Sequence, residues 1–219
     1  MKVIITGSTG MVGRGVLLEC LEDDQIESVL LLNRNPTEVK HSKIKEILVK
    51  DFFDWTGFLE QLKGYQACFF CLGISSVGMS EEAYSRITYD LTLALAKPLR
   101  ELNQEMVFIY VSGTGTDSSE KGRIMWARVK GRTENALFAL GFKAMFAFRP
   151  GLIIPEKGIR SRTKLYQAVY ILLRPFFPLL KRMSSVTSTS RIGRAMISLA
   201  KNPQPPYYLE NREINAVSE

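Results

Sequence analysis

Three glycines at a regular spacing form the clearest chemical signal in the sequence. Gly7, Gly10 and Gly13 lie in VIITGSTGMVGRGVL, between a strand-like apolar run and a helix-like one. Glycine permits a tight turn and a close approach of the backbone to a ligand, and a following helix start offers free N–H groups to phosphate. The pattern predicts a phosphate-binding turn, and a structural turn without a ligand is the alternative.

The glycine spacing differs from two common phosphate-binding motifs. It is G-x-x-G-x-x-G rather than the G-x-G-x-x-G of ordinary Rossmann dehydrogenases. No Gly-Lys-Ser/Thr closes it, which excludes a P-loop.

The residues after the second expected strand indicate which dinucleotide binds. An Asp or Glu about 20 residues beyond the glycines would hold the ribose 2′-OH of NAD, but the chain has Asn33 and Arg34 there. Arg14 directly follows the last glycine. Two guanidinium groups and no carboxylate favour a 2′-phosphate, so we expect NADP(H) to be preferred over NAD(H). The alternative for Arg34 is a solvated loop residue.

A tryptophan and a lysine four residues apart form a second pattern. Trp126 and Lys130 lie in MWARVKG at an expected helix start, where this spacing places both side chains on one face. An indole N–H only donates hydrogen bonds and does not ionise in the accessible pH range. Trp126 can therefore hydrogen-bond a carbonyl but cannot give it a proton, and ordinary packing is the alternative.

The elements that must position these residues follow an alternating pattern. Continuous apolar runs separated by helical patterns predict a parallel sheet covered on both faces, a Rossmann-like doubly wound α/β fold with a small C-terminal helical cap. The expected strands cover residues 2–7, 28–34, 44–52, 67–73, 106–113 and 143–153. The expected helices cover residues 13–23, 55–64, 80–102, 126–141 and 191–202.

We expect one domain over residues 1–219, with residues 156–190 as a cap or substrate-side insertion. Residues 165–183 are apolar but contain Arg174, Pro175 and Pro178, so they lack the ~20 uninterrupted apolar residues of a spanning helix. A wall of a substrate pocket or a homodimer contact is favoured for this stretch, and a segment lying on a membrane surface is the alternative.

Composition indicates a soluble globular protein, with 46% hydrophobic and 23% charged residues. Three cysteines make no disulfide framework and no cleavable leader is visible, so a reducing, cytoplasmic setting is expected. Cys68 and Cys71 are interpreted as core residues that point to opposite faces of a strand. With His41 as the only histidine, neither a metal site nor a histidine triad is expected.

Charge is distributed unevenly along the chain. Residues 1–120 carry a net charge of −6 and residues 121–219 one of +13, and residues 143–201 hold twelve basic residues and one acid. This basic segment is a candidate docking surface for anionic lipid, which would make the protein a peripheral membrane protein. No nucleic acid is expected as a partner, because no known nucleic-acid-binding pattern accompanies the charge.

The glycine motif resembles that of the extended and atypical short-chain dehydrogenase/reductases. The overall pattern is most similar to the NAD(P)-binding epimerase-like proteins grouped with the Tat-interacting tumour-suppressor branch, over nearly the whole chain. The resemblance assigns the cofactor to the turn at Gly7, Thr9, Gly10, Met11, Val12, Gly13 and Arg14. It also assigns cofactor binding to residues at or just after the ends of later strands, namely Asn33, Arg34, Asp51, Phe52, Cys71, Leu72, Gly73, Pro150 and Gly151.

The same resemblance implies a catalytic set. Ser112 ends the fifth expected strand, where the family has its serine, and Lys130 matches the lysine that also bonds the nicotinamide ribose. The family has a tyrosine four residues before this lysine, whose phenol gives the carbonyl oxygen its proton because the neighbouring cation lowers a pKa that starts near 10. Trp126 occupies that place here.

Other tyrosines could act as the proton donor, and the sequence does not rank them: Tyr89, Tyr110, Tyr166 and Tyr170. Buried packing is favoured for Tyr110. Two function hypotheses follow. The first is an NADP(H)-dependent carbonyl oxidoreductase or epimerase-like enzyme with an atypical site, acting on a small-molecule substrate. The second is a catalytically weak or inactive NADP(H)-dependent regulator or adaptor.

Overall fold

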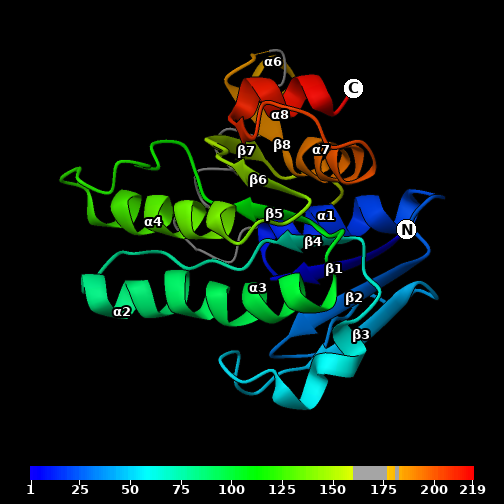
Figure 1. Cartoon of the computed structure of the whole chain (residues 1–219). Helices are drawn as coiled ribbons and strands as arrows, with labels where there is room; N and C mark the ends of the chain where they lie inside the picture. The colour runs from blue at the N-terminus through cyan, green and yellow to red at the C-terminus, as the bar shows by residue number, and fades with distance from the viewer. Residues whose placement is uncertain (160–176, 181–182) are drawn as a thin grey trace.

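The computed structural model describes residues 1–159, 177–180 and 183–219, which form a seven-stranded parallel sheet in the order β3-β2-β1-β4-β5-β6-β9 (Figure 1). This is the Rossmann-like arrangement that the sequence predicts, so the expected fold class is confirmed. The strands of this sheet are β1 (Lys2–Thr6), β2 (Ser28–Asn33), β3 (Ile44–Leu48), β4 (Ala67–Phe70), β5 (Val107–Val111), β6 (Ala144–Phe148) and β9 (Tyr208–Leu209).

Helices connect the strands and cover both faces of the sheet. They are α1 (Met11–Glu22), α2 (Glu81–Ser85), the π-helix η2 (Arg86–Asp90), α3 (Leu91–Leu102), α4 (Met125–Ala139), α6 (Phe177–Leu180), α7 (Thr189–Lys201) and α8 (Asn211–Val217). The helix expected over residues 55–64 is the 3₁₀-helix η1 (Thr56–Leu62). Elements α2, η2 and α3 follow one another without a break, as the expected helix over residues 80–102 requires.

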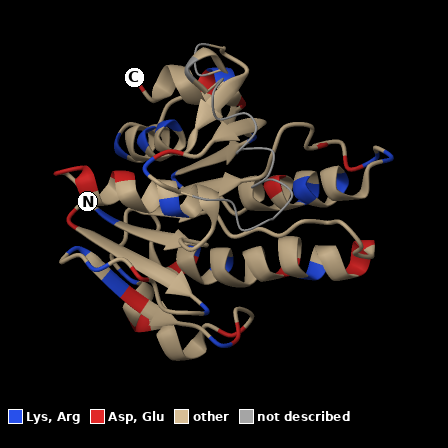
Figure 2. Ribbon diagram, turned by 180° about the vertical axis from the view of Figure 1, so that it is seen from behind, with Lys and Arg blue, Asp and Glu red and all other residues tan. Residues whose placement is uncertain are grey.

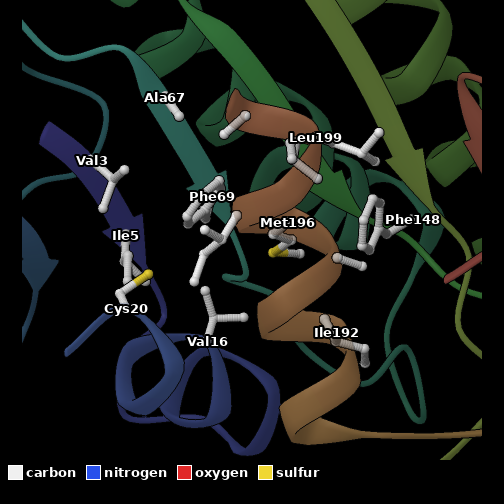
Figure 3. Close-up of a cluster of buried hydrophobic side chains, with 14 of the residues drawn as sticks. Val3, Ile5, Val16, Cys20, Ala67, Phe69, Phe148, Ile192, Met196 and Leu199 are labelled. Atoms are coloured by element: carbon white, nitrogen blue, oxygen red, sulfur yellow. The ribbon is translucent and has the colours of Figure 1, made fainter. Parts of the chain in front are cut away.

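Two hydrophobic clusters lie on opposite faces of the sheet. The first joins the sheet to α1 and α7, and Figure 3 shows Val16 of α1 facing Met196 of α7, with Cys20 of α1 beside Ile5 of β1. The second joins the other face to η1, α3 and α4. Because both faces are covered, an inner strand such as β2 is buried at every residue, which explains its continuous apolar sequence.

Charged residues lie mainly on the helices, the loops and the edge strand β3, whereas the central strands are nearly free of charge (Figure 2). Strand β3 has one neighbour, β2, and only one of its five residues is fully buried. A solvent-exposed edge tolerates charge, so Lys45 and Glu46 can occupy this strand.

The strand expected over residues 143–153 is interrupted. Strand β6 ends at Phe148, and Pro150, which has no N–H to give to a neighbouring strand, follows it. The chain resumes as β7 (Leu152–Ile154), which pairs with β8 (Val186–Ser188) in a separate two-stranded parallel sheet.

The expected cap lies largely outside the described residues, because residues 160–176 and 181–182 fall within it. The apolar stretch at 165–183 shares this position, as do Tyr166 and Tyr170. The described part of the cap contributes α6, β8 and the start of α7. Within the described residues, no helix has the length and apolarity needed to cross a membrane.

Candidate functional site

The glycine turn connects β1 to α1 in a conformation that requires glycine. Gly7 has a φ of +67°, and a Cβ at Gly13 would lie 2.3 Å from the Gly7 carbonyl oxygen. A Cβ at Gly7 would lie 2.7 Å from the carbonyl oxygen of Cys71, so the turn packs tightly against the end of β4. No side chain caps the N-terminus of α1 at Gly10, which leaves its first N–H groups available to a phosphate.

A cavity of about 290 Å³ lies beside this turn. It brings together three segments that the sequence marked separately, namely the turn, the end of β2 and the loop after β4. Among the described residues that line it, only Arg34 carries a charge at neutral pH. The lining residues are Gly7, Thr9, Gly10, Met11, Leu32, Asn33, Arg34, Asn35, Phe52, Cys71, Leu72 and Gly73.

Seven of the expected cofactor residues do not line this cavity. Lys130, Pro150 and Gly151 belong to the region at the ends of β5 and β6, and the other four lie closer to the turn. Gly13 is buried beneath the turn, and Val12 and Arg14 lie farther along α1. Asp51 is exposed, and its Oδ1 accepts a hydrogen bond of 2.8 Å from the Phe53 backbone N–H, within its own turn. The neighbouring Phe52 is buried and reaches the cavity.

Both cysteines of the C-x-x-C pair belong to the core, on opposite faces as expected. Cys68 belongs to the cluster beneath α3, and Cys71 packs against the cluster beneath α1 and α7. Burial raises the pKa of the Cys71 thiol to about 12, so it is neutral at physiological pH. At the cavity, Cys71 therefore offers its backbone and an uncharged side chain.

Trp126 and Lys130 share one face of α4, as their spacing predicts. The Lys130 Nζ lies 6.0 Å from the centre of the Trp126 ring, and it donates a hydrogen bond to the backbone carbonyl of Ser112 at the end of β5. Burial lowers the pKa of Lys130 to about 8, and the nearby Glu134 carboxylate acts in the opposite direction. Trp126 is half-buried, and its ring lies against Gly115.

The hydroxyl of Ser112 belongs to a buried polar cluster. Its Oγ donates a hydrogen bond of 2.5 Å to Oε1 of Glu134, a carboxylate that is fully buried on α4. Arg149 donates to the same carboxylate through Nε and Nη2. Glu134 was not among the residues predicted from the sequence, although its position four residues after Lys130 places it on the same helix face.

Thr114 is an accessible hydroxyl that the sequence analysis also missed. It lies two residues beyond Ser112, is exposed, and donates a hydrogen bond of 2.9 Å to the Arg149 carbonyl. The Thr114 backbone N–H donates to the carbonyl of Pro150 at 3.1 Å. Thr114 and Gly151 line a second cavity, of about 390 Å³, together with Ser184, Ser185, Glu210, Asn211, Arg212 and Glu213.

Two of the alternative tyrosines are visible, and both have packing partners. Tyr110 is buried within the cluster beneath α3, and burial raises the pKa of its phenol, which confirms its packing role. The ring of Tyr89 lies 4.2 Å from the Arg132 guanidinium carbon.

Several sequence relatives are FMP52 proteins. The chain is 26% identical over 158 residues to Protein FMP52 of Meyerozyma guilliermondii, covering 72% of this chain and 67% of the relative. It is 29% identical over 175 residues to fmp52 of Emericella nidulans, covering 77% and 72%. It is 27% identical over 205 residues to FMP52-2 of Scheffersomyces stipitis, covering 92% and 87%. All three are named mitochondrial proteins.

These names contradict the cytoplasmic setting expected from the sequence. That expectation rested on free cysteines and on the lack of a visible leader. Reduced cysteines show only that the surroundings are reducing, so they do not identify one compartment.

Solved structures share the fold of this chain at low identity. WbmF of Bordetella bronchiseptica, solved with NAD⁺, superposes with a TM-score of 0.72 at 13% identity, over 98% of this chain and 76% of that one. Gre2 of Candida albicans, solved with NADPH, gives a TM-score of 0.71 at 12% identity, over 96% and 77%. Residues 3–121 match the model of the NAD dependent epimerase/dehydratase family, which covers more than half of the sequence. With its glycine turn, parallel sheet and cavity at the turn, the chain belongs to the NAD dependent epimerase/dehydratase family.

Proposed function

We propose that the protein binds NADP(H) in the cavity at the glycine turn and is an oxidoreductase or epimerase-like enzyme with an atypical proton-transfer site. The observation that carries this proposal is the lining of the cavity. It has glycines that admit a pyrophosphate, and Arg34 is the only charged residue among the described residues that line it. No carboxylate pairs with Arg34 in the described part of the chain. The family and the NADPH-bound relative in fold support a nicotinamide cofactor.

Each part of the cavity would hold a different part of the cofactor. The N–H groups at the start of α1 suit the pyrophosphate, the Arg34 guanidinium suits a 2′-phosphate, and the apolar surface of Phe52 and Leu72 suits the adenine. When bound, the nicotinamide accepts or supplies the hydride. In this proposal Lys130, whose Nζ donates a hydrogen bond to the Ser112 carbonyl at the end of β5, bonds the ribose.

The proton-transfer end of the site, at the end of β5 and the start of α4, is unusual in two ways. Trp126 offers only an N–H donor, and the Ser112 hydroxyl already donates to Glu134. The Thr114 hydroxyl, near the end of β5, is exposed where that of Ser112 is buried, so it can exchange its hydrogen bond to the Arg149 carbonyl for one to a substrate oxygen. In this proposal Thr114 and the Trp126 indole orient the substrate oxygen, and water supplies the proton.

Titration of the purified protein with NADPH and NADH tests the cofactor assignment. Replacing Arg34 with Ala removes the cation that faces the 2′-phosphate, so we expect NADPH binding to weaken about tenfold while NADH binding is unchanged. Arg123→Ala is the matched control, because Arg123 is exposed and does not line the cavity. Equal affinity of the wild-type protein for the two cofactors would refute the NADP(H) preference.

The altered proton-transfer end also favours a second function, a cofactor-dependent regulator with little or no turnover. Trp126→Tyr separates the two functions in an assay of NADPH oxidation with aldehydes, ketones and quinones. If the site lacks only its acid, the new phenol beside Lys130 should raise the rate about 100-fold. If the wild-type protein and the variant are both inactive while NADPH still binds, the regulator is the better description. Vesicle flotation at two salt concentrations, with and without NADPH, then tests its docking on anionic lipid.

A further inference from the structure

Asn33, the last residue of β2, is held by a partner on each side. The Ser8 hydroxyl, in the glycine turn, donates a hydrogen bond of 2.8 Å to Asn33 Oδ1. Asn33 Nδ2 donates one of 2.7 Å to Oε1 of Glu46 on the neighbouring strand β3. Asn33 is only 3% exposed and yet lines the cavity, so these two bonds determine what the end of β2 presents there.

Glu46 determines both the orientation and the identity of residue 33. An ionised carboxylate only accepts hydrogen bonds, so the amide nitrogen must face Glu46 and the amide oxygen must face Ser8. An aspartate at position 33 would place a carboxylate oxygen where Nδ2 now lies, 2.7 Å from Oε1 of Glu46. Two negative charges at that distance repel strongly, so Glu46 disfavours an acid at the place where NAD-binding proteins carry theirs.

Glu46 also holds the loop that carries Arg34. Its Oε1 accepts a second hydrogen bond, of 2.9 Å, from the backbone N–H of Thr37. This bond fixes the loop that follows β2, whose residues Arg34 and Asn35 line the cavity. Glu46 itself does not line the cavity, and its Oε1 is shared by two N–H donors.

We propose that Glu46 is a specificity-determining residue for the 2′-phosphate of NADP(H), which it favours by excluding an acid from position 33 and by holding the loop that presents Arg34. The inference rests on the proposed function, because it assumes that the cavity binds this cofactor. Cofactor specificity then depends on a residue of β3 as well as on the residues at the end of β2.

A set of four variants tests the proposal through cofactor affinity, with melting temperature as a check on folding. Asn33→Asp should lower the melting temperature and weaken NADPH binding without a gain in NADH binding. In the double variant Asn33→Asp/Glu46→Gln the repulsion is gone, so NADH should bind about tenfold more tightly than to Asn33→Asp alone. Glu46→Ala should weaken NADPH binding about tenfold, because the Arg34 loop is released. Glu38→Gln, an exposed acid in the same loop, is the matched control.

Binding of the fragments 2′,5′-ADP and 5′-AMP shows whether the loss of NADPH affinity depends on the 2′-phosphate. Only 2′,5′-ADP, which carries that phosphate, should bind more weakly to Glu46→Ala than to the wild-type protein. Identical NADH affinity of Asn33→Asp in the two backgrounds would overturn the proposal, as would an unchanged ratio of NADPH to NADH affinity in Glu46→Ala. These results differ from a failure of the proposed function, in which the wild-type protein binds neither cofactor or Arg34→Ala has no effect.

Discussion

The two ends of the site differ in what their side chains are free to do. At the glycine turn, backbone groups and Arg34 face a cavity, and the buried Asn33 holds the surrounding strands in place. At the end of β5, the Ser112 hydroxyl, Glu134 and Arg149 are bonded to one another. In the proposed function, cofactor binding therefore rests on backbone shape, whereas catalysis would depend on side chains that differ from the family pattern or are bonded within the structure.

The largest effect on stability should come from removing Glu134, the centre of the cluster that it forms with Ser112 and Arg149. Glu134→Ala leaves Arg149 and Ser112 without their shared buried partner, so we expect the free energy of unfolding to fall by about 3 kcal/mol. Chemical denaturation measures it, and Glu82→Ala, an exposed acid on α2, is the control. A loss of stability no greater than that of the control would show that the cluster is not the structural unit described above.

The cofactor end should be most sensitive to backbone shape. A Cβ at Gly13 would meet the Gly7 carbonyl oxygen at 2.3 Å, so Gly13→Ala should destabilise the protein by about 2 kcal/mol. It should also abolish NADPH binding. Gly57→Ala is the control, because the added Cβ would meet no atom within 4 Å apart from those of its own chain neighbours and helix backbone. If Gly13→Ala binds NADPH normally, the turn does not require glycine there.

A smaller effect should appear in the pH dependence of stability. Lys130 has a folded-state pKa of about 8, below its ordinary value of 10.5, so the unfolded chain binds more protons between these two pH values. The free energy of unfolding should therefore rise with pH across this interval, by on the order of 2 kcal/mol relative to Lys130→Met. Lys97→Met, which replaces an exposed lysine on α3, is the control variant. A flat difference for Lys130→Met would mean that burial does not perturb this lysine.

The same contrast explains how much the sequence could predict. Apolar runs predicted the six main strands, because burial on both faces of a sheet leaves a continuous apolar sequence. The spacing of the glycines predicted the turn, because close backbone packing requires glycine at fixed positions. The Ser112–Glu134–Arg149 cluster joins residues far apart in the chain, so no local pattern shows that the serine hydroxyl is already bonded. The break after β6 was missed because Pro150 was interpreted only as part of a cofactor motif.

Replacing Asp51 should have the smallest effect on NADPH affinity, and it tests whether the cofactor contacts residues outside the cavity. The family resemblance assigns Asp51 to the cofactor, but the Asp51 carboxylate accepts a hydrogen bond within its own turn and does not line the cavity. Asp51→Ala should therefore change NADPH affinity less than about twofold, while Phe52→Ala, which removes a cavity wall, should weaken binding more. A tenfold loss in Asp51→Ala would mean that the adenine extends past the cavity, and the resemblance would then be the better guide than the cavity.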